Sequence, residues 1–276
     1  MPNLSEVSLG ISNYELLTDL KLFKAVKRFQ TMQLGESLAI RILYLNDLED
    51  LTKYYILNNQ SKDLPYHNAY HAWCMVLNCY EAARYYHLSD TSQRSLLLAA
   101  LFHDYGHSGG YLDDRSNVNI ARKGLRQAII KLCTCCNGFG MLSRVMGDGS
   151  NDDEPCPDCI VPPIEVNLAI DLIEVTKYPY EVEPKTLLEQ IIRDADLMQV
   201  YERSAKKIGE QYLGLYHEIK INRPCTLLQF VDGNQKFQEA VSWHTEWAKN
   251  KASVLDYDGK IVRLRKILIR STGDEE

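Results

Sequence analysis

Apolar residues recur along most of this chain at the spacing of α-helices. Between Tyr14 and Met32 they follow a period close to 3.6 residues, and Leu38–Leu57 continues in the same way. His67–Tyr86 is rich in residues that favour helices. The other predicted helices are Ser92–Phe102 (capped by Ser89 or Asp90), Ser116–Lys131 (capped by Ser116), Pro163–Thr176, Pro184–Tyr201, Ala205–Tyr212, Leu227–Lys249 and Lys260–Ile269. Because no segment shows a convincing strand alternation, the sequence predicts an all-α helical bundle.

Residues 133–162 depart from this helical pattern. They read CTCCNGFGMLSRVMGDGSNDDEPCPDCIVP, which is dense in Cys, Gly, Asp and Pro. Gly, Asp and Pro favour turns and loops over helices. Because candidate functional residues lie on both sides of this segment, we interpret it as an insertion within one catalytic domain, residues 1–276, and not as a second domain.

Composition and charge narrow the class of protein. The 276 residues are 45% hydrophobic and 25% charged, which is ordinary for a soluble globular protein. A net charge of −6 gives no strong signal for nucleic-acid binding. The longest apolar run, Leu96–Phe102, is too short to cross a bilayer, and the N-terminus lacks the features of a signal peptide. We therefore expect a cytoplasmic protein that does not bind membranes.

Four of the seven histidines form two pairs with four-residue spacing, His67/His71 and His103/His107, and Asp104 follows His103 directly. Residues four apart on a helix share a face, so each pair can direct two imidazoles at one point. Imidazole and carboxylate groups together bind first-row divalent metals. A later segment, Ile191–Met198, can supply a closing carboxylate. The pattern indicates a metal-dependent hydrolase.

These motifs carry a family resemblance. HNxxH in YHNAYHA, followed by HDxxH in ALFHDYGHSGG and a later helical Asp, resembles the HD-domain phosphohydrolase superfamily. Within it, Leu48–Gly110 resembles the class I cyclic nucleotide phosphodiesterases. Members of that branch usually have an acidic residue and a Pro where this chain has Gly106 and Ser108.

The resemblance implies a role for each motif residue. One divalent ion would be held by His71, His103, Asp104 and Asp196, and Asp104 would also bridge to a second ion. His67 would be the general acid that protonates the leaving oxygen, and His107 would orient a water or contact the phosphate. The metal could be Zn, Mn, Mg, Fe, Co or Ni. Asp194 and Asp196 point about 200° apart on a helix; the resemblance of the ADL tripeptide favours Asp196 as the ligand and leaves Asp194 in a supporting or surface position.

A nucleotide substrate follows from the same resemblance. In the cyclic nucleotide branch a C-terminal Gln binds the base and a nearby Phe clamps it; here either Gln229 with Phe230 or Gln235 with Phe237 could serve. The residues that could line the pocket or support the ligands are Tyr66, Tyr70, Tyr105, Glu81, Asp113 and Asp114. The Asn68 amide could either fix the helix that follows it or contact the surroundings of the metal site.

Two other functions stay open at the level of sequence. A nucleotidase or deoxynucleotide triphosphohydrolase would need further cations for its phosphates, which Arg41, Arg115, Arg122 and Lys123 could provide. A non-catalytic, nucleotide-binding or regulatory HD module would instead be expected to lack a ligand residue, and none is missing.

The insertion has the cysteine spacing of a structural zinc site. Cys133-x2-Cys136 and Cys156-x2-Cys159 are separated by nineteen residues, although Cys135 could replace one neighbour. The CxxCxGxG start also resembles the zinc-binding knuckles of DnaJ-type chaperones. We expect this knuckle to form a lid over the substrate pocket, or a surface for a protein partner or a second copy of the chain. The other cysteines, Cys74, Cys79 and Cys225, are predicted to be buried apolar positions.

Overall fold

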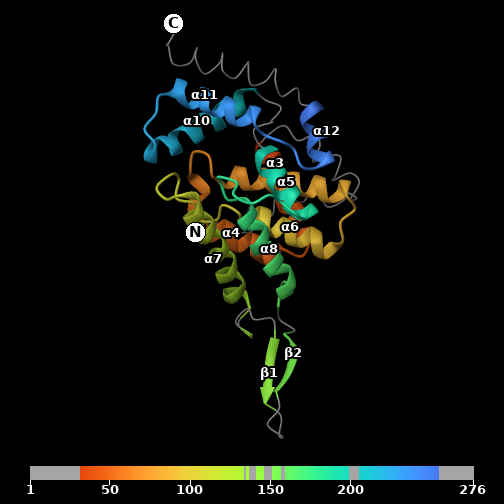
Figure 1. Ribbon diagram of the computed structural model, residues 1–276. Helices are drawn as coiled ribbons and strands as arrows, with labels where there is room; N and C mark the ends of the chain where they lie inside the picture. Colours follow the sequence, from red (N-terminus) through yellow and green to blue (C-terminus); the bar gives the residue numbers. More distant parts are fainter. Residues whose placement is uncertain are drawn as a thin grey trace.

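The computed structural model describes residues 32–133, 135–136, 141–145, 151–156, 159–198 and 205–254. The helices within these ranges are α3 (Met32–Leu45), α4 (Glu49–Asn58), the 3-10 helix η3 (Gln60–Asp63), α5 (Ala69–Tyr85), α6 (Asp90–Phe102), α7 (Asp114–Leu132), α8 (Pro163–Val175), α9 (Leu187–Leu197), α10 (Ala205–Asn222), α11 (Leu227–Glu239) and α12 (Glu246–Val254). The body of the molecule is helical, which confirms the predicted all-α fold (Figure 1). The helix predicted at Lys260–Ile269 lies outside the described residues, as does Tyr14–Met32 except for Met32.

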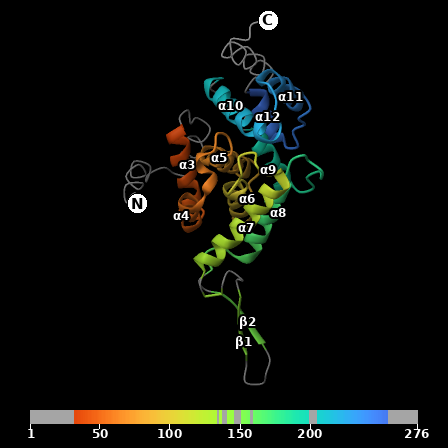
Figure 2. The same ribbon diagram turned by 90° about the vertical axis from the view of Figure 1, so that its left-hand side faces the viewer.

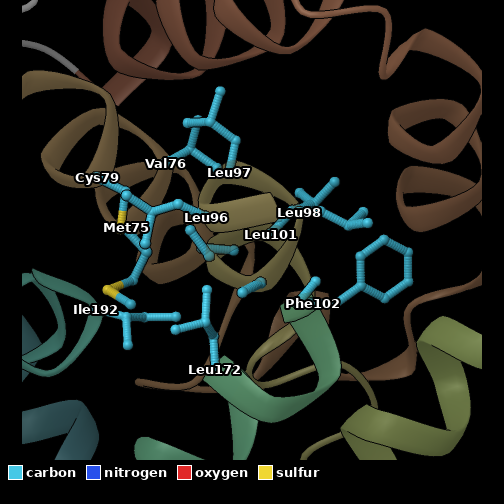
Figure 3. Close-up of a cluster of buried hydrophobic side chains, with 14 of the residues drawn as sticks. Met75, Val76, Cys79, Leu96, Leu97, Leu98, Leu101, Phe102, Leu172 and Ile192 are labelled. Atoms are coloured by element: carbon cyan, nitrogen blue, oxygen red, sulfur yellow. The ribbon is translucent and has the colours of Figure 1, made fainter. Parts of the chain in front are cut away.

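Helix α6 forms the centre of the core. It packs between α5 and α8, and each residue of Leu96–Phe102 has an exposed fraction of 0%. A helix that is apolar on all sides has to be covered on all sides, which explains the uninterrupted run LLLAALF. Figure 3 shows its leucines beside side chains from three neighbouring helices, among them Met75, Val76, Cys79, Leu172 and Ile192.

Two of the predicted helices are each divided in two. Leu38–Leu57 is interrupted after Leu45, because Asp47 adopts a left-handed backbone with φ of 58°. Leu227–Lys249 ends as α11 and begins again as α12. The start of α7 also differs from the prediction, since the Ser116 N–H donates to Asp113 Oδ1 at 2.8 Å and Asp113 is therefore the cap.

Asp194 explains where α12 begins. Its carboxylate accepts from the His244 N–H at 3.1 Å, from the Thr245 N–H at 2.8 Å and from Thr245 Oγ at 2.6 Å. Both N–H groups lie just before α12, and Thr245 Oγ in turn accepts from the Ala248 N–H at 3.1 Å. Asp194 therefore holds the residue that caps the helix. Asp194 is 0% exposed. The sequence allowed it a surface position, but it ties α9 to α12 inside the fold.

We expect Asp194→Ala to lower the free energy of unfolding by about 2–3 kcal/mol, because it leaves buried donors without an acceptor. Urea denaturation measures the change. The control is Asp171→Ala, which removes an exposed carboxylate from α8 and should stay within about 0.5 kcal/mol of the wild type. Equal effects of the two substitutions would contradict the assigned role of Asp194.

A β-hairpin that the sequence did not predict occupies the insertion. Strand β1 (Met141–Val145) pairs antiparallel with β2 (Asn151–Pro155), so that Met141 lies opposite Pro155 and Val145 opposite Asn151. Strand β2 reads NDDEP and contains no alternation of apolar and polar residues that would indicate a strand. The hairpin projects from the end of the body opposite to α10 and α11 (Figures 1 and 2). Across the described residues, no helix combines the length and apolar character that a membrane crossing requires.

Candidate metal centre and active-site cavity

The four motif histidines lie at helix ends, and not along a helix face as the spacing predicted. His67 precedes α5, because the N-cap Asn68 is extended (φ −108°, ψ −177°) and its Oδ1 accepts from the His71 N–H at 3.1 Å. His103 is the C-cap of α6, and His107 follows in a turn. The rings consequently associate between the motifs: His67 stacks on His107 with centroids 3.7 Å apart, and His71 lies beside His103 at 4.9 Å.

The turn that carries Asp104 is held by a short upstream segment. Asn59 Oδ1 accepts from the Gly106 N–H at 3.0 Å, and Ser61 Oγ donates to the Asp104 carbonyl at 3.1 Å. Gly106 itself has φ of +70°, a conformation that suits glycine. Residues just before the first motif therefore position the second motif.

Four donor atoms converge from α5, the end of α6 and α9. His71 Nε2 and His103 Nε2 are 2.9 Å apart, and Asp104 Oδ2 lies 2.9 and 3.0 Å from them. Asp196 Oδ1 is 3.5 Å from His71 Nε2 and 3.9 Å from His103 Nε2. Two ligands at right angles, each about 2.1 Å from an ion, lie about 3 Å apart. The spacing of His71, His103 and Asp104 therefore fits a common divalent ion, whereas Asp196 lies at the edge of this group and outside the set of donors that are all within 4.8 Å of one another.

Hydrogen bonding and charge at the cluster also suit a cation. His103 Nδ1 donates to the Ala100 carbonyl at 2.9 Å, which leaves the Nε2 lone pair available to a metal. Burial lowers the pKa of His71, but its hydrogen bonds with Asp104 and Asp196 outweigh burial and raise that pKa to about 10. The negative charge that stabilises a proton at this position also stabilises a metal ion.

Glu218 of α10 is a site residue that the sequence did not indicate. Its Oε2 lies 2.5 Å from His67 Nδ1, and its Oε1 accepts from the backbone N–H groups of Tyr66 at 2.6 Å and His67 at 3.1 Å. Burial raises the pKa of Glu218, but the hydrogen bond and charge of His67 outweigh burial and lower it. A single Glu in an amphipathic helix gives no signal of such a role, because 151 residues separate it from His67.

Two glycines allow α10 to approach the motif loops. A Cβ atom on Gly110 would lie 2.1 Å from the Glu218 carbonyl oxygen, and one on Gly214 would lie 2.3 Å from the Pro65 carbonyl oxygen. Both contacts are backbone contacts that a side chain could not relieve by rotating. The position of Glu218 therefore depends on glycine at both sites.

His107 lies beside the donor cluster and belongs to a second candidate group of metal ligands, together with His67 and Asp104. Burial, with the charge of His67 next in size, lowers the pKa of His107 to about 4, so its ring is neutral near pH 7. The Gly109 N–H donates to His107 Nδ1 at 3.0 Å, which places the ring proton on Nε2. His67, Asp104 and His107 each offer a donor atom within 4.8 Å of the others, as do His71, His103 and Asp104. Asp104 belongs to both groups, but in the second group both nitrogens of His107 are already engaged, one by the Gly109 N–H and one by the ring proton.

A cavity of about 510 Å³ lies over this centre. Besides the motif residues, α10, α11, the start of α7 and the loop after α8 form its walls. Tyr178 and Phe237 meet edge to face across it with ring centroids 5.5 Å apart. The aromatic residues that line it are Tyr66, Tyr178, Tyr180, Tyr212, Phe230 and Phe237.

Some of the predicted pocket residues line the cavity and others do not. Those that do are Tyr66, Asp114, Gln229, Phe230 and Phe237. Burial raises the pKa of Asp114 to about 6, and the charges of Asp104 and Asp196 add to the shift. Asn68, Tyr70, Tyr105 and Gln235 are not among the lining residues.

Physical reasons account for the residues outside the cavity. Asn68 is engaged as the cap of α5, and the Tyr105 hydroxyl donates to the Asn58 carbonyl at 3.2 Å. Tyr70 is buried within α5, and Gln235 donates to exposed Glu239. Two other carboxylates were expected to support the metal ligands, but both are engaged elsewhere. Glu81 accepts from Lys251 at 2.8 Å, and Asp113 caps α7.

The described residues of the Cys-rich insertion do not form the lid over this cavity that the sequence suggested. None of the described residues in 133–162 lines it. Asp114, at the start of α7, lines the cavity, whereas Cys133 lies just past the end of that helix. A helix of 19 residues is about 28 Å long, so it separates the two sites.

No family model and no curated protein sequence matches this chain. Among solved structures, one described as "Structure of LmjPDEB1 in complex with IBMX" matches with a TM-score of 0.49 and 14% sequence identity. The match covers 96% of this chain and 90% of that chain. A similarity this low carries no argument about activity, which has to follow from the residues of the cavity.

Proposed function

We propose that this protein is a metal-dependent phosphohydrolase that cleaves a nucleotide phosphodiester, with a cyclic mononucleotide as the substrate. The observation that carries the proposal is that two chemical groups share one cavity. One is the donor cluster of His71, His103, Asp104 and Asp196, all of which except the buried His103 line the cavity; the other is the His67–Glu218 pair. Phosphodiester hydrolysis needs an activated water and a proton for the leaving alkoxide.

The cluster fits divalent metal ions of several kinds, because imidazole suits Zn, Fe, Co and Ni while carboxylates also suit Mn and Mg. Such ions, when bound, supply Lewis acidity and acidify water to a pKa of about 7. His103 is already in the tautomer that binds through Nε2. Asp104, whose oxygen lies against both imidazoles, keeps the ligands converged.

His67 is suited to give the proton. Its Nδ1 donates to the Glu218 carboxylate, so Nε2 is the nitrogen left to serve the cavity that His67 lines. The Glu218 carboxylate holds the His67 ring in one orientation, as a general acid that must reach the leaving oxygen requires. His107, with a neutral ring and its proton on Nε2, can donate a hydrogen bond to a phosphate oxygen.

The charge of the cavity favours a substrate with a single phosphate group. Among the described residues that line it, Arg223 is the one Arg or Lys. Of the cations suggested for a triphosphate, Arg122 pairs with Glu174 at 2.7 Å and Arg115 lies 3.6 Å from Glu181. Binding three phosphates requires several charge-assisted hydrogen bonds. A triphosphohydrolase is therefore the less well supported alternative.

The walls of the cavity suit a planar base. Phe230 and Phe237 line it beside Tyr178. Gln229 Oε1 accepts from the Thr226 N–H at 2.9 Å, so the amide NH2 of Gln229 is the group left to donate to a base edge. Aromatic walls stack on bases without regard to base identity. Because Gln229 lines the cavity and Gln235 does not, we favour Gln229 as the base contact.

A substrate panel tests the proposal. We expect the purified chain with Mn²⁺, Mg²⁺ or Co²⁺ to hydrolyse cyclic mononucleotides at least tenfold more efficiently than dNTPs, dNMPs or cyclic oligonucleotides. Gln229→Ala should lower kcat/KM about tenfold, the value of one hydrogen bond, whereas Gln235→Ala should leave it unchanged. Hydrolysis of dNTPs or dNMPs alone would replace the substrate assignment, and binding without any hydrolysis would favour a regulatory module.

A further inference from the structure

Four cysteine sulfurs meet at the base of the hairpin, outside the cavity. Cys133 Sγ lies 3.4 Å from Cys136, 3.6 Å from Cys156 and 3.8 Å from Cys159, and Cys136 Sγ lies 3.3 Å from Cys159. These separations are far longer than the 2.05 Å bond of a disulfide. Four thiolates arranged tetrahedrally about 2.3 Å from a zinc ion lie about 3.8 Å from one another. From this geometry we propose that the four cysteines bind one structural zinc ion.

The local fold explains how two distant CxxC pairs meet. Cys133 is the C-cap of α7 and Cys136 follows within a turn. The hairpin then returns the chain, and the Cys159 N–H donates to the Cys156 carbonyl at 3.4 Å just before α8. Each pair thus forms a short turn, as CxxC ligands of structural zinc do.

The described residues around the four cysteines do not form an apolar core. Cys133, Cys136 and Cys156 are 1%, 5% and 7% exposed, yet among the described residues the cluster contains only these three and the partly buried Cys159. Cys79, by contrast, is buried within the main core. Three small side chains bury too little surface to fix a 23-residue excursion between Cys133 and Cys156. A metal–thiolate site supplies that stability directly.

The proposed ion joins the end of α7 to the start of α8. These two helices pack against each other, and their far ends bring Asp114 and Thr176 to the cavity. A tetrathiolate zinc has no open coordination position, so it takes no part in hydrolysis. The ion instead closes the open ends of the helix pair and holds the hairpin out from the body (Figure 2).

Cobalt substitution tests the site without an activity assay. Co²⁺ bound to thiolates gives an intense sulfur-to-metal charge-transfer band in the near ultraviolet, which His and Asp ligands do not give. We expect the full chain, loaded with Co²⁺, to show this band at one equivalent per chain, and Asp104→Asn to retain it. Cys133→Ser and Cys156→Ser should lose it. The matched control is Cys135→Ser, which changes an exposed thiol between two proposed ligands.

If a serine variant fails to fold, zinc release from the wild-type chain tests the site independently. A mercurial that titrates thiols should release one zinc per wild-type chain and lower its Tm. The wild-type chain should also keep one zinc in the presence of EDTA, whereas Cys156→Ser should not. A folded wild-type chain without the charge-transfer band would overturn the proposal. Loss of the band in Cys135→Ser to the same extent as in Cys133→Ser would overturn this choice of ligands.

Discussion

Asp104→Asn should abolish both metal binding at the histidine cluster and hydrolysis, with kcat at least about a thousandfold lower. The Asp104 oxygen lies 2.9 Å from His71 Nε2 and 3.0 Å from His103 Nε2, and the residue belongs to both candidate ligand groups. An Asn side chain of the same shape keeps the packing. It removes the negative charge that stabilises a metal cation bound to the two neutral imidazoles. Metal content by elemental analysis and kcat with saturating Mn²⁺ measure the two effects.

A matched carboxylate separates this effect from a general loss of charge. Asp113→Asn changes an exposed residue that caps α7 and does not line the cavity, and Asn is an equally good cap. This variant should keep wild-type metal content and kcat. An Asp104→Asn protein that still hydrolysed the substrate at the wild-type rate would refute the metal mechanism.

His67→Ala is expected to lower kcat by about a hundredfold to ten-thousandfold while the metal content stays unchanged, because it removes a general acid. The defect should shrink with a p-nitrophenyl phosphodiester, whose leaving group departs without a proton. Glu218→Gln should show the same dependence on the leaving group with a smaller loss, since it keeps the backbone hydrogen bonds to Tyr66 and His67 but removes the charge. Initial rates on both substrates measure the contrast.

The control for this pair is His217→Ala. His217 is exposed on α10 directly before Glu218, so its loss should leave both rates unchanged. The competing role for His67 is ligation of a second ion together with Asp104 and His107. In that case His67→Ala would lose metal, and the better leaving group would not restore the rate; either finding would refute the acid role.

The helical fold could be predicted because the information is local. The run Leu96–Phe102 required burial on every side, and α6 is indeed the central helix of the core. Breaks within helices were harder to predict. The left-handed Asp47 has no strong sequence signal, and the start of α12 depends on Asp194, fifty residues earlier. The hairpin was missed because its strands are short and one of them is acidic.

The site divides in a similar way. The motifs named residues that the structure brings into contact, including His71, His103 and Asp104, because the proposed metal site depends on residue type and on close spacing, both of which are visible in the sequence. The same patterns offered the Cys-rich insertion as a lid or as a docking surface; its described residues lie beyond the far end of α7 and do not line the cavity, which disfavours the lid and leaves the docking surface untested. Distance along a folded helix, about 28 Å here, cannot be inferred from a motif's place between two others.

The amino-acid sequence alone specified the helices, the two histidine motifs and the two CxxC pairs, because each of these features involves residues only a few positions apart. It left open how the histidines pair and what supports them. The stacking of His67 on His107 and the contact of Glu218 with His67 exist because α10 packs against Gly110 and the Pro65 carbonyl. The contact of Glu218 with His67 joins residues 151 positions apart. The packing of the whole body, and not the local sequence, therefore selects it.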